Sequence, residues 1–173
     1  MYENFEPKYP GPEHELSRSE AKESFAWFMS QKDTRIAALK QLTGTSGLES
    51  LSRDTLPELH EWFVTKVSAE PRQDDGGISA FTRSLCNDIG MFMGDLLIES
   101  TAGITWELCT EAKGHFSYHR PHLIGFIKGY SDVDYNLLLV QYAHRLSAGR
   151  EVEADLFSVL FNSSYGRAKP KTQ

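Results

Sequence analysis

The chain has 173 residues and a formal net charge of −6, and 40% of its residues are hydrophobic and 12% aromatic. This length fits one domain, and the apolar content predicts a packed core instead of a disordered chain. The acidic balance and the scattered Lys and Arg residues exclude non-specific nucleic-acid binding, which needs a basic surface. No run approaches 18 uncharged apolar residues, and no basic segment followed by an apolar one begins the chain. We therefore expect a cytoplasmic protein without a membrane span or a secretory signal.

The first 15 residues contain three prolines and a glycine, which predicts an extended arm. Its aromatic residues Tyr2, Phe5 and Tyr9 are expected to lie against the body of the protein or against a neighbouring subunit. We expect a single globular domain over residues 16–166 and a flexible tail at 167–173.

The first helix is predicted to begin after Ser17, because Ser17 and Glu20 have the spacing of a capping box. Apolar residues then recur every three or four positions as far as Leu42, which is typical of a helix with one buried face. Gly44 is expected to end this helix in a left-handed conformation.

A second helix is predicted from about Asp54 or Thr55, with Pro57 tolerated in its first turn, up to a loop at residues 69–77. We expect His60 of this helix to lie at the surface. Two further helices are predicted over residues 132–148, ended by Gly149, and over residues 152–165. His144 is expected to be a partly buried core histidine.

A third helix, predicted over residues 78–99, carries Gly90 and Gly94 one turn apart in its interior. Glycine at such positions costs about 1 kcal/mol relative to alanine. The two glycines predict that another element packs closely against this helix, because no side chain stands in the way. A ligand that touches the helix backbone is the alternative.

Residues 104–119 predict a β-hairpin with a three-residue loop, Ala112 to Gly114, in which Gly114 is left-handed. This register matches apolar with apolar residues, and it places Glu111 opposite His115 and Glu107 opposite His119. With the helices, it predicts an α+β fold that is mostly helical, with about five helices and one small antiparallel hairpin.

The hairpin also holds the residue types that could carry chemistry. Glu107, Cys109 and His119 can each bind zinc, and with His115 they are the candidate catalytic residues. We favour a structural interpretation, in which each strand histidine pairs with the glutamate opposite, because this arrangement seldom gives a closed tetrahedral site. His122 lies beyond Pro121 and is expected to be separate. We expect no metal and no cofactor.

Cys86 and Cys109 are too few and too far apart for a disulfide framework or a CxxC metal motif. We expect two reduced and buried thiols.

Residues 78–164 run from a helix with small residues through "GDLLIESTAGITWEL" into a tryptophan-bearing strand, and a later helix ends in "LSAGRE". In this order of features the chain resembles uncharacterised bacterial families with a glycine-then-tryptophan junction between a helix and a hairpin. Some of these families are associated with toxin–immunity or accessory loci. The matching positions are Gly94, Gly103, Trp106 and Gly149. The resemblance assigns no functional residue.

The sequence contains no nucleophile elbow, phosphate loop or dinucleotide-binding fingerprint. The leading hypothesis is therefore a bacterial, non-enzymatic module of the immunity or accessory type that binds another protein with a basic surface. The alternative is a small enzyme or ligand-binding protein that uses the Glu/Cys/His cluster, in a cleft between the third helix and the hairpin. Self-association through the N-terminal arm is a third hypothesis.

Overall fold

The computed structural model describes residues 2–71, 73, 76–151 and 153–171. Over these residues the chain forms five α-helices, one short 3-10 helix and two antiparallel sheets of two strands each. In chain order they are η1 (Glu13–Glu15), α1 (Arg18–Gly44), α2 (Leu56–Ala69), α3 (Ala80–Ser100), β1 (Thr101–Ala102), β2 (Thr105–Leu108), β3 (Pro121–Ile124), α4 (Tyr135–Ser147), α5 (Leu156–Arg167) and β4 (Lys169–Pro170). The predicted α+β class, with helices dominant, is confirmed.

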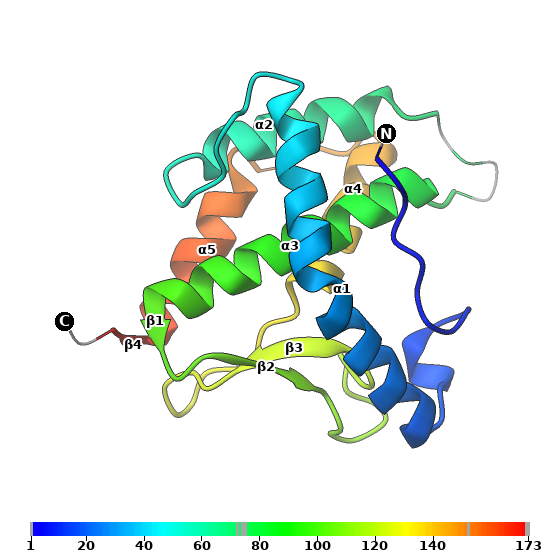
Figure 1. The fold of residues 1–173 in the computed structure, drawn as a ribbon, viewed down its shortest axis with the longest axis vertical. Helices are drawn as coiled ribbons and strands as arrows, with labels where there is room; N and C mark the ends of the chain where they lie inside the picture. Colours follow the sequence, from blue (N-terminus) through cyan, green and yellow to red (C-terminus); the bar gives the residue numbers. More distant parts are fainter. Residues whose placement is uncertain (1, 72, 74–75, 152, 172–173) are drawn as a thin grey trace.

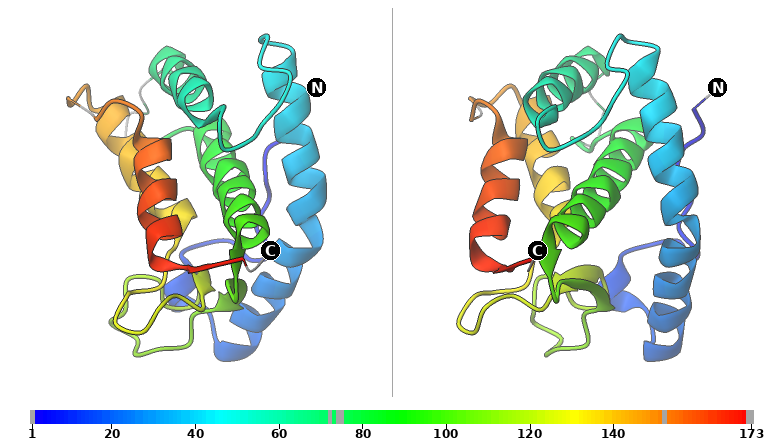
Figure 2. Two further views of the ribbon diagram at one scale, coloured as in Figure 1. Left: turned by 90° about the vertical axis from the view of Figure 1, so that its left-hand side faces the viewer. Right: turned by 60° about the vertical axis from the view of Figure 1, so that its left-hand side comes forward.

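Helix α3 is the central element, with α1 on one side and α4 and α5 on the other (Figure 1 and Figure 2). Every residue from Ser84 to Gly94 is buried, so this part of the helix is covered on all sides. No helix in the described ranges is both long enough and apolar enough to cross a bilayer.

The two interior glycines of α3 lie where neighbouring elements come closest. A Cβ atom at Gly90 would lie 3.1 Å from the backbone nitrogen of Asn136, at the start of α4. A Cβ atom at Gly94 would overlap the indole ring of Trp106 on β2. The prediction of close packing at these glycines is confirmed.

Helix α1 begins as predicted and ends in a different conformation. The Ser17 side chain accepts a hydrogen bond from the Glu20 backbone, and the Glu20 carboxylate accepts one from the Ser17 backbone, so the capping box is formed. Gly44 is helical, and the left-handed residue is Gly47, with a φ of 90°. The helix does end at Gly44, as expected, but Gly44 is not left-handed, because the Thr45 backbone still donates to Gln41 and keeps Gly44 in the helical bonding pattern.

The remaining helices follow the predicted order. Helix α2 has Thr55 at its N-cap and ends at Ala69, where the loop was predicted; residues 72, 74 and 75 of that loop lie outside the described residues. The Asp134 side chain caps α4 by accepting from the Leu137 backbone, and α5 begins at Leu156, four residues later than predicted, after a cap by Asp155. Residue 152, where the last helix was expected to start, lies outside the described residues.

Two predictions about histidines in the helices were wrong. His60 is only 6% exposed, and its Nε2 atom lies 2.7 Å from the hydroxyl oxygen of Tyr142 on α4. Its ring also makes an edge contact with Phe157 of α5, so the face of α2 that carries His60 packs against both helices. His144 is exposed, because the buried side of α4 is formed by other residues, among them Leu139 and Ala143.

The first strand of the hairpin was predicted correctly and its partner was not. Strand β2 pairs with β3, so Glu107 faces His122 and Trp106 faces Leu123. The expected pairing of Glu107 with His119 is therefore wrong, and His122 belongs to the sheet. The later segment forms the strand because Leu123 becomes fully buried there, whereas Phe116 in the expected strand stays 61% exposed.

Residues 109–120 form a turn-rich connection instead of a strand and a tight loop. Cys109 and Arg120 close the connection, because the Cys109 backbone donates to Arg120 and accepts from His119. The residue with positive φ is His119, at 61°, and Gly114 is not left-handed. The alternating residues of this segment therefore lie in successive turns and do not share the two faces of a strand.

The expected flexible tail is partly a strand. Strand β4 pairs with β1, which follows directly after α3, and this pairing holds Lys169 and Pro170 against the body. Residues 172–173 of the tail lie outside the described residues.

Candidate functional site

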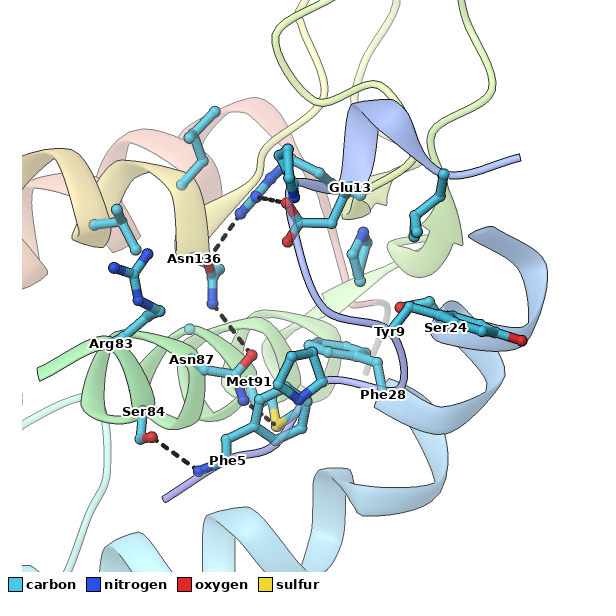
Figure 3. A pocket seen from close by; sticks show the side chains of 18 of the residues that line it. Phe5, Tyr9, Glu13, Ser24, Phe28, Arg83, Ser84, Asn87, Met91 and Asn136 are labelled. Atoms are coloured by element: carbon cyan, nitrogen blue, oxygen red, sulfur yellow. Dashed lines mark hydrogen bonds and ion pairs between the residues drawn. The ribbon is translucent and has the colours of Figure 1, made fainter. Parts of the chain in front are cut away.

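A cavity of about 560 Å³ lies between the N-terminal arm (residues 2–12), α1, α3, the start of α4 and the β2–β3 sheet (Figure 3). We call it the arm cavity. Its apolar wall includes one side chain from each of five elements: Phe5, Phe28, Met91, Trp106 and Val140. The polar atoms in its wall come mainly from α3, η1, the start of α4 and the end of the 109–120 connection.

The arm is fixed to the body at its beginning, which confirms that its aromatic residues pack on the body of the protein. The Tyr2 hydroxyl donates to Asp88, and its ring makes an edge contact with Phe81 at 5.6 Å. The Phe5 backbone donates to the Ser84 hydroxyl at 2.8 Å. These contacts place one side of the arm along α3.

The middle of the arm is held by α1. The indole nitrogen of Trp27 donates to the Glu6 carbonyl at 3.0 Å, and the Tyr9 hydroxyl donates to Glu23. The arm thus spans from α3 to α1 and forms a wall of the cavity along its length (Figure 3).

A buried ion pair lies under the start of the arm. Arg35 of α1 donates from Nε and Nη2 to the two carboxylate oxygens of Asp88 at 2.9 and 2.6 Å, and from Nη1 to the Glu3 carbonyl at 2.7 Å. Arg35 is 7% exposed and Asp88 is fully buried. Burial raises the pKa of the Asp88 carboxyl, whereas the hydrogen bonds from Arg35 and Tyr2 oppose this effect. The pair therefore joins α1, α3 and the arm in one buried polar cluster.

A second polar network lies in the cavity wall, with Arg120 at its centre. The Arg120 guanidinium contacts Glu13 at 3.0 Å, Asp134 at 2.7 Å and the Asn136 side chain at 2.8 Å. Asn136 in turn donates to the Asn87 side chain at 3.2 Å. The chain from Glu13 to Asn87 is visible in Figure 3 and fixes these groups before any ligand binds.

The lining residues can orient a bound molecule more readily than they can react with it. No histidine or cysteine is among the residues described as lining the arm cavity. The Ser84 hydroxyl donates to the Ala80 carbonyl while it accepts from Phe5, so it has no base to activate it. The wall thus combines large apolar surfaces with a few fixed polar groups, the composition typical of small-molecule sites.

The structure brings three of the chemistry-bearing hairpin residues together, away from this cavity. The Cys109 sulfur lies 3.5 Å from Nδ1 of His115, and Nε2 of His115 lies 3.6 Å from the Glu111 carboxylate. The predicted Glu111–His115 pair is therefore formed, within a turn instead of across two strands. The Ser117 backbone also donates to Nδ1 of His115.

This cluster does not have the form of a reactive thiol site. Cys109 is 1% exposed, and burial raises the pKa of its thiol, which keeps it protonated at neutral pH. Cys86 is fully buried, and burial likewise raises the pKa of its thiol. Both thiols are free and buried, as the sequence predicts.

The other two candidates, Glu107 and His119, do not form their predicted pair. Glu107 is exposed, whereas His119 is 4% exposed and its Nδ1 atom lies 3.1 Å from the Leu16 carbonyl. Nδ1 of His122 lies 3.9 Å from the Asp132 carboxylate. Across the described residues, no three His, Cys, Asp or Glu side chains are grouped so that they could hold a metal ion.

The residues that build the arm cavity were missed by sequence reasoning. No spacing motif in the sequence links Arg120, Asn87 and Asn136. Their contacts join residues up to 49 positions apart. One signal did point to them, since Gly90 lies both against Asn136 and in the cavity wall. The close approach predicted at this glycine therefore marks the edge of the site.

No protein-family model, curated protein or solved structure matches this chain. No residue role is therefore carried over from a relative, and the resemblance based on Gly94, Gly103, Trp106 and Gly149 stays a prediction.

Proposed function

We propose that this protein binds a small, largely apolar molecule and that the arm cavity is its binding site. The observation that supports the proposal is a cavity of about 560 Å³ with mainly apolar walls and a preformed polar network at one side. Ligand pockets in proteins commonly have volumes of about 300–1,000 Å³ and this kind of lining.

The proposed role is binding without catalysis. The polar side chains of the wall hydrogen-bond to one another, so they are suited to orienting a ligand. The nearest arrangement of thiol, imidazole and carboxylate, at Cys109, His115 and Glu111, does not line the cavity.

The test uses a substitution that fills the cavity without removing a known contact. Ser24 of α1 lines the cavity, and its side chain makes no hydrogen bond with a described residue. Ser24→Trp places a large ring in the ligand's space. Ser19→Trp is the matched control, because Ser19 is exposed on the same helix and lies outside the cavity wall.

A diverse library of small apolar compounds is first screened by thermal shift, and the compounds that bind are titrated by calorimetry. We expect compounds that bind the natural protein to lose at least about tenfold in affinity in Ser24→Trp and to keep their affinity in Ser19→Trp. A library without a single binding compound, or equal affinity in both variants, would contradict the proposal.

A second candidate function is the protein-binding module of the immunity or accessory type. Two exposed aromatic side chains favour this candidate. Phe116, in the connection before β3, is 61% exposed, and Tyr130, in the connection after β3, is 53% exposed. The net charge of −6 would favour a basic partner. Phe116→Ser with Tyr130→Ser should abolish binding to such a partner, whereas Val159→Ser, which removes a 52% exposed side chain from α5, should not. Equal loss in both variants would contradict this candidate.

A further inference from the structure

Arg83 differs from the other charged residues that line the arm cavity. Glu13 and Arg120 neutralise each other at 3.0 Å, and Asp134 also pairs with Arg120. The guanidinium of Arg83 makes no hydrogen bond or ion pair with any residue that the structure describes, and the residue is exposed. One positive charge at the edge of the cavity is therefore available to a ligand.

Arg83 shares its face of α3 with the residues that line the cavity more deeply. Asn87 and Gly90 follow it at intervals of four and three positions, which places all three on the same side of the helix. Figure 3 shows the Arg83 side chain extending from α3 beside the labelled cavity residues. A group bound by Arg83 would thus lie at the end of a path that continues inward along Asn87 and Gly90.

The remaining wall sets the rest of the ligand's chemistry. Phe5, Phe28, Met91 and Trp106 offer apolar contacts, so the body of the ligand is apolar. A guanidinium binds carboxylates through two parallel hydrogen bonds and repels a cationic group.

We infer that the natural ligand is an amphipathic carboxylate, with its apolar body in the arm cavity and its carboxylate bound by Arg83. This inference rests on the proposed function, because it assigns the ligand class of the same site.

The experiment compares three probes with the same apolar body, namely octanoate, octanol and octylamine. Each is titrated calorimetrically into the full chain, into Arg83→Gln and into Arg18→Gln. Arg18→Gln is the matched control, because it removes the same charge. Arg18 is exposed at the start of α1 and lies outside the cavity wall.

We expect octanoate to bind the natural protein at least about tenfold more tightly than octanol or octylamine, since charge-assisted hydrogen bonds contribute about this much. Arg83→Gln should remove this advantage and leave octanol binding unchanged, and Arg18→Gln should change neither. Circular dichroism of the three proteins shows whether each is folded.

Three results would overturn the inference: octanoate binds no better than octanol, octylamine binds best, or Arg83→Gln keeps the affinity for octanoate. Failure of all three probes to bind would overturn it as well. The proposed function is judged separately, by the compound screen and by Ser24→Trp. Compounds that lose affinity in Ser24→Trp, together with octanoate that binds no better than octanol, would support the site and reject the carboxylate.

Discussion

The 109–120 connection and the face of α3 that lines the arm cavity differ in what their residue types indicate about a site. The connection holds a cysteine, two histidines and a glutamate within eleven positions, yet these do not form one reactive cluster. Cys109 and Glu111 both contact His115, whereas His119 contacts the Leu16 carbonyl. The α3 face presents Asn87, Gly90 and Met91, which are not reactive types, and it forms a wall of the arm cavity. We infer that the position of the proposed binding site is indicated by small and polar residues in a buried helix. A gathering of reactive residue types is the weaker indicator.

The largest expected effect concerns the buried ion pair on the α3 side. Asp88→Ala leaves the Arg35 guanidinium buried without its partner, so we expect the free energy of unfolding to fall by about 3–5 kcal/mol. Urea denaturation followed by circular dichroism measures this loss. Asp33→Ala is the control. The Asp33 side chain pairs with Lys32 but is 92% exposed, so its removal should have little effect on the unfolding free energy.

A double variant separates the charge effect from packing. Arg35→Met combined with Asp88→Leu removes both charges, and it should recover most of the stability that Asp88→Ala loses. A double variant as unstable as the single one would contradict the account of this pair.

The second effect concerns the close approach of β2 to α3. Gly94→Ala places a methyl group in the volume of the Trp106 indole, so we expect a loss of about 1–3 kcal/mol in unfolding free energy. Gly166→Ala on α5 is the matched control, because no atom lies within 4 Å of a Cβ built there. The control should leave stability unchanged or raise it, by up to about 1 kcal/mol; equal destabilisation by both variants would contradict the role of Gly94.

The third effect is a pH dependence of stability that we attribute to His60, which lies outside the 109–120 connection. Burial lowers the pKa of His60 below its ordinary value of 6.5. The unfolded chain therefore takes up this proton first as the pH falls through about 6.5, and the folded protein loses stability below that pH. Between pH 7.5 and 5.5 we expect the unfolding free energy to fall, and to fall less in His60→Gln. The same loss should persist in His144→Gln, because His144 is exposed.

The smallest effect belongs to the connection itself. His115→Ala removes a contact of 3.6 Å with Glu111, a carboxylate that is 59% exposed, so we expect a change in stability below about 1 kcal/mol. Binding of compounds in the arm cavity should not change, because His115 lies outside its wall. Calorimetric titration of His115→Ala checks this, and a loss of binding would reverse the comparison between the two regions.

Features set by neighbouring residues could be predicted from the sequence. Ser17 and Glu20 define the start of α1, Pro57 lies in the first turn of α2, and Gly90 and Gly94 mark close approaches to α3. The capping box and Pro57 act within one helical turn, so they remain valid whatever the tertiary structure. The two glycines indicate that a neighbouring element approaches α3, but they do not identify that element.

Features set by distant residues could not be predicted in the same way. The alternation of His115, Ser117 and His119 resembles a strand, but burial of Leu123 in the core selects the later segment as the partner of β2. The Arg35–Asp88 pair joins positions 53 apart, and its sequence signal is only that Arg35 interrupts the apolar face of α1. The sequence offered a cleft between α3 and the hairpin as an alternative, and the arm cavity includes residues of both. The part formed by the arm and by Arg120 depends on contacts between distant residues, so it could not be predicted.

The central claim is that the arm cavity, and not the histidine-rich connection, is the ligand-binding site. Nuclear magnetic resonance spectra of the labelled protein, titrated with a compound from the thermal-shift screen, test this claim directly. The account predicts shifts for the Trp106 indole, the Gly90 amide and the side-chain amides of Asn87 and Asn136, with residues 109–119 unchanged. Shifts confined to residues 109–119 would contradict it.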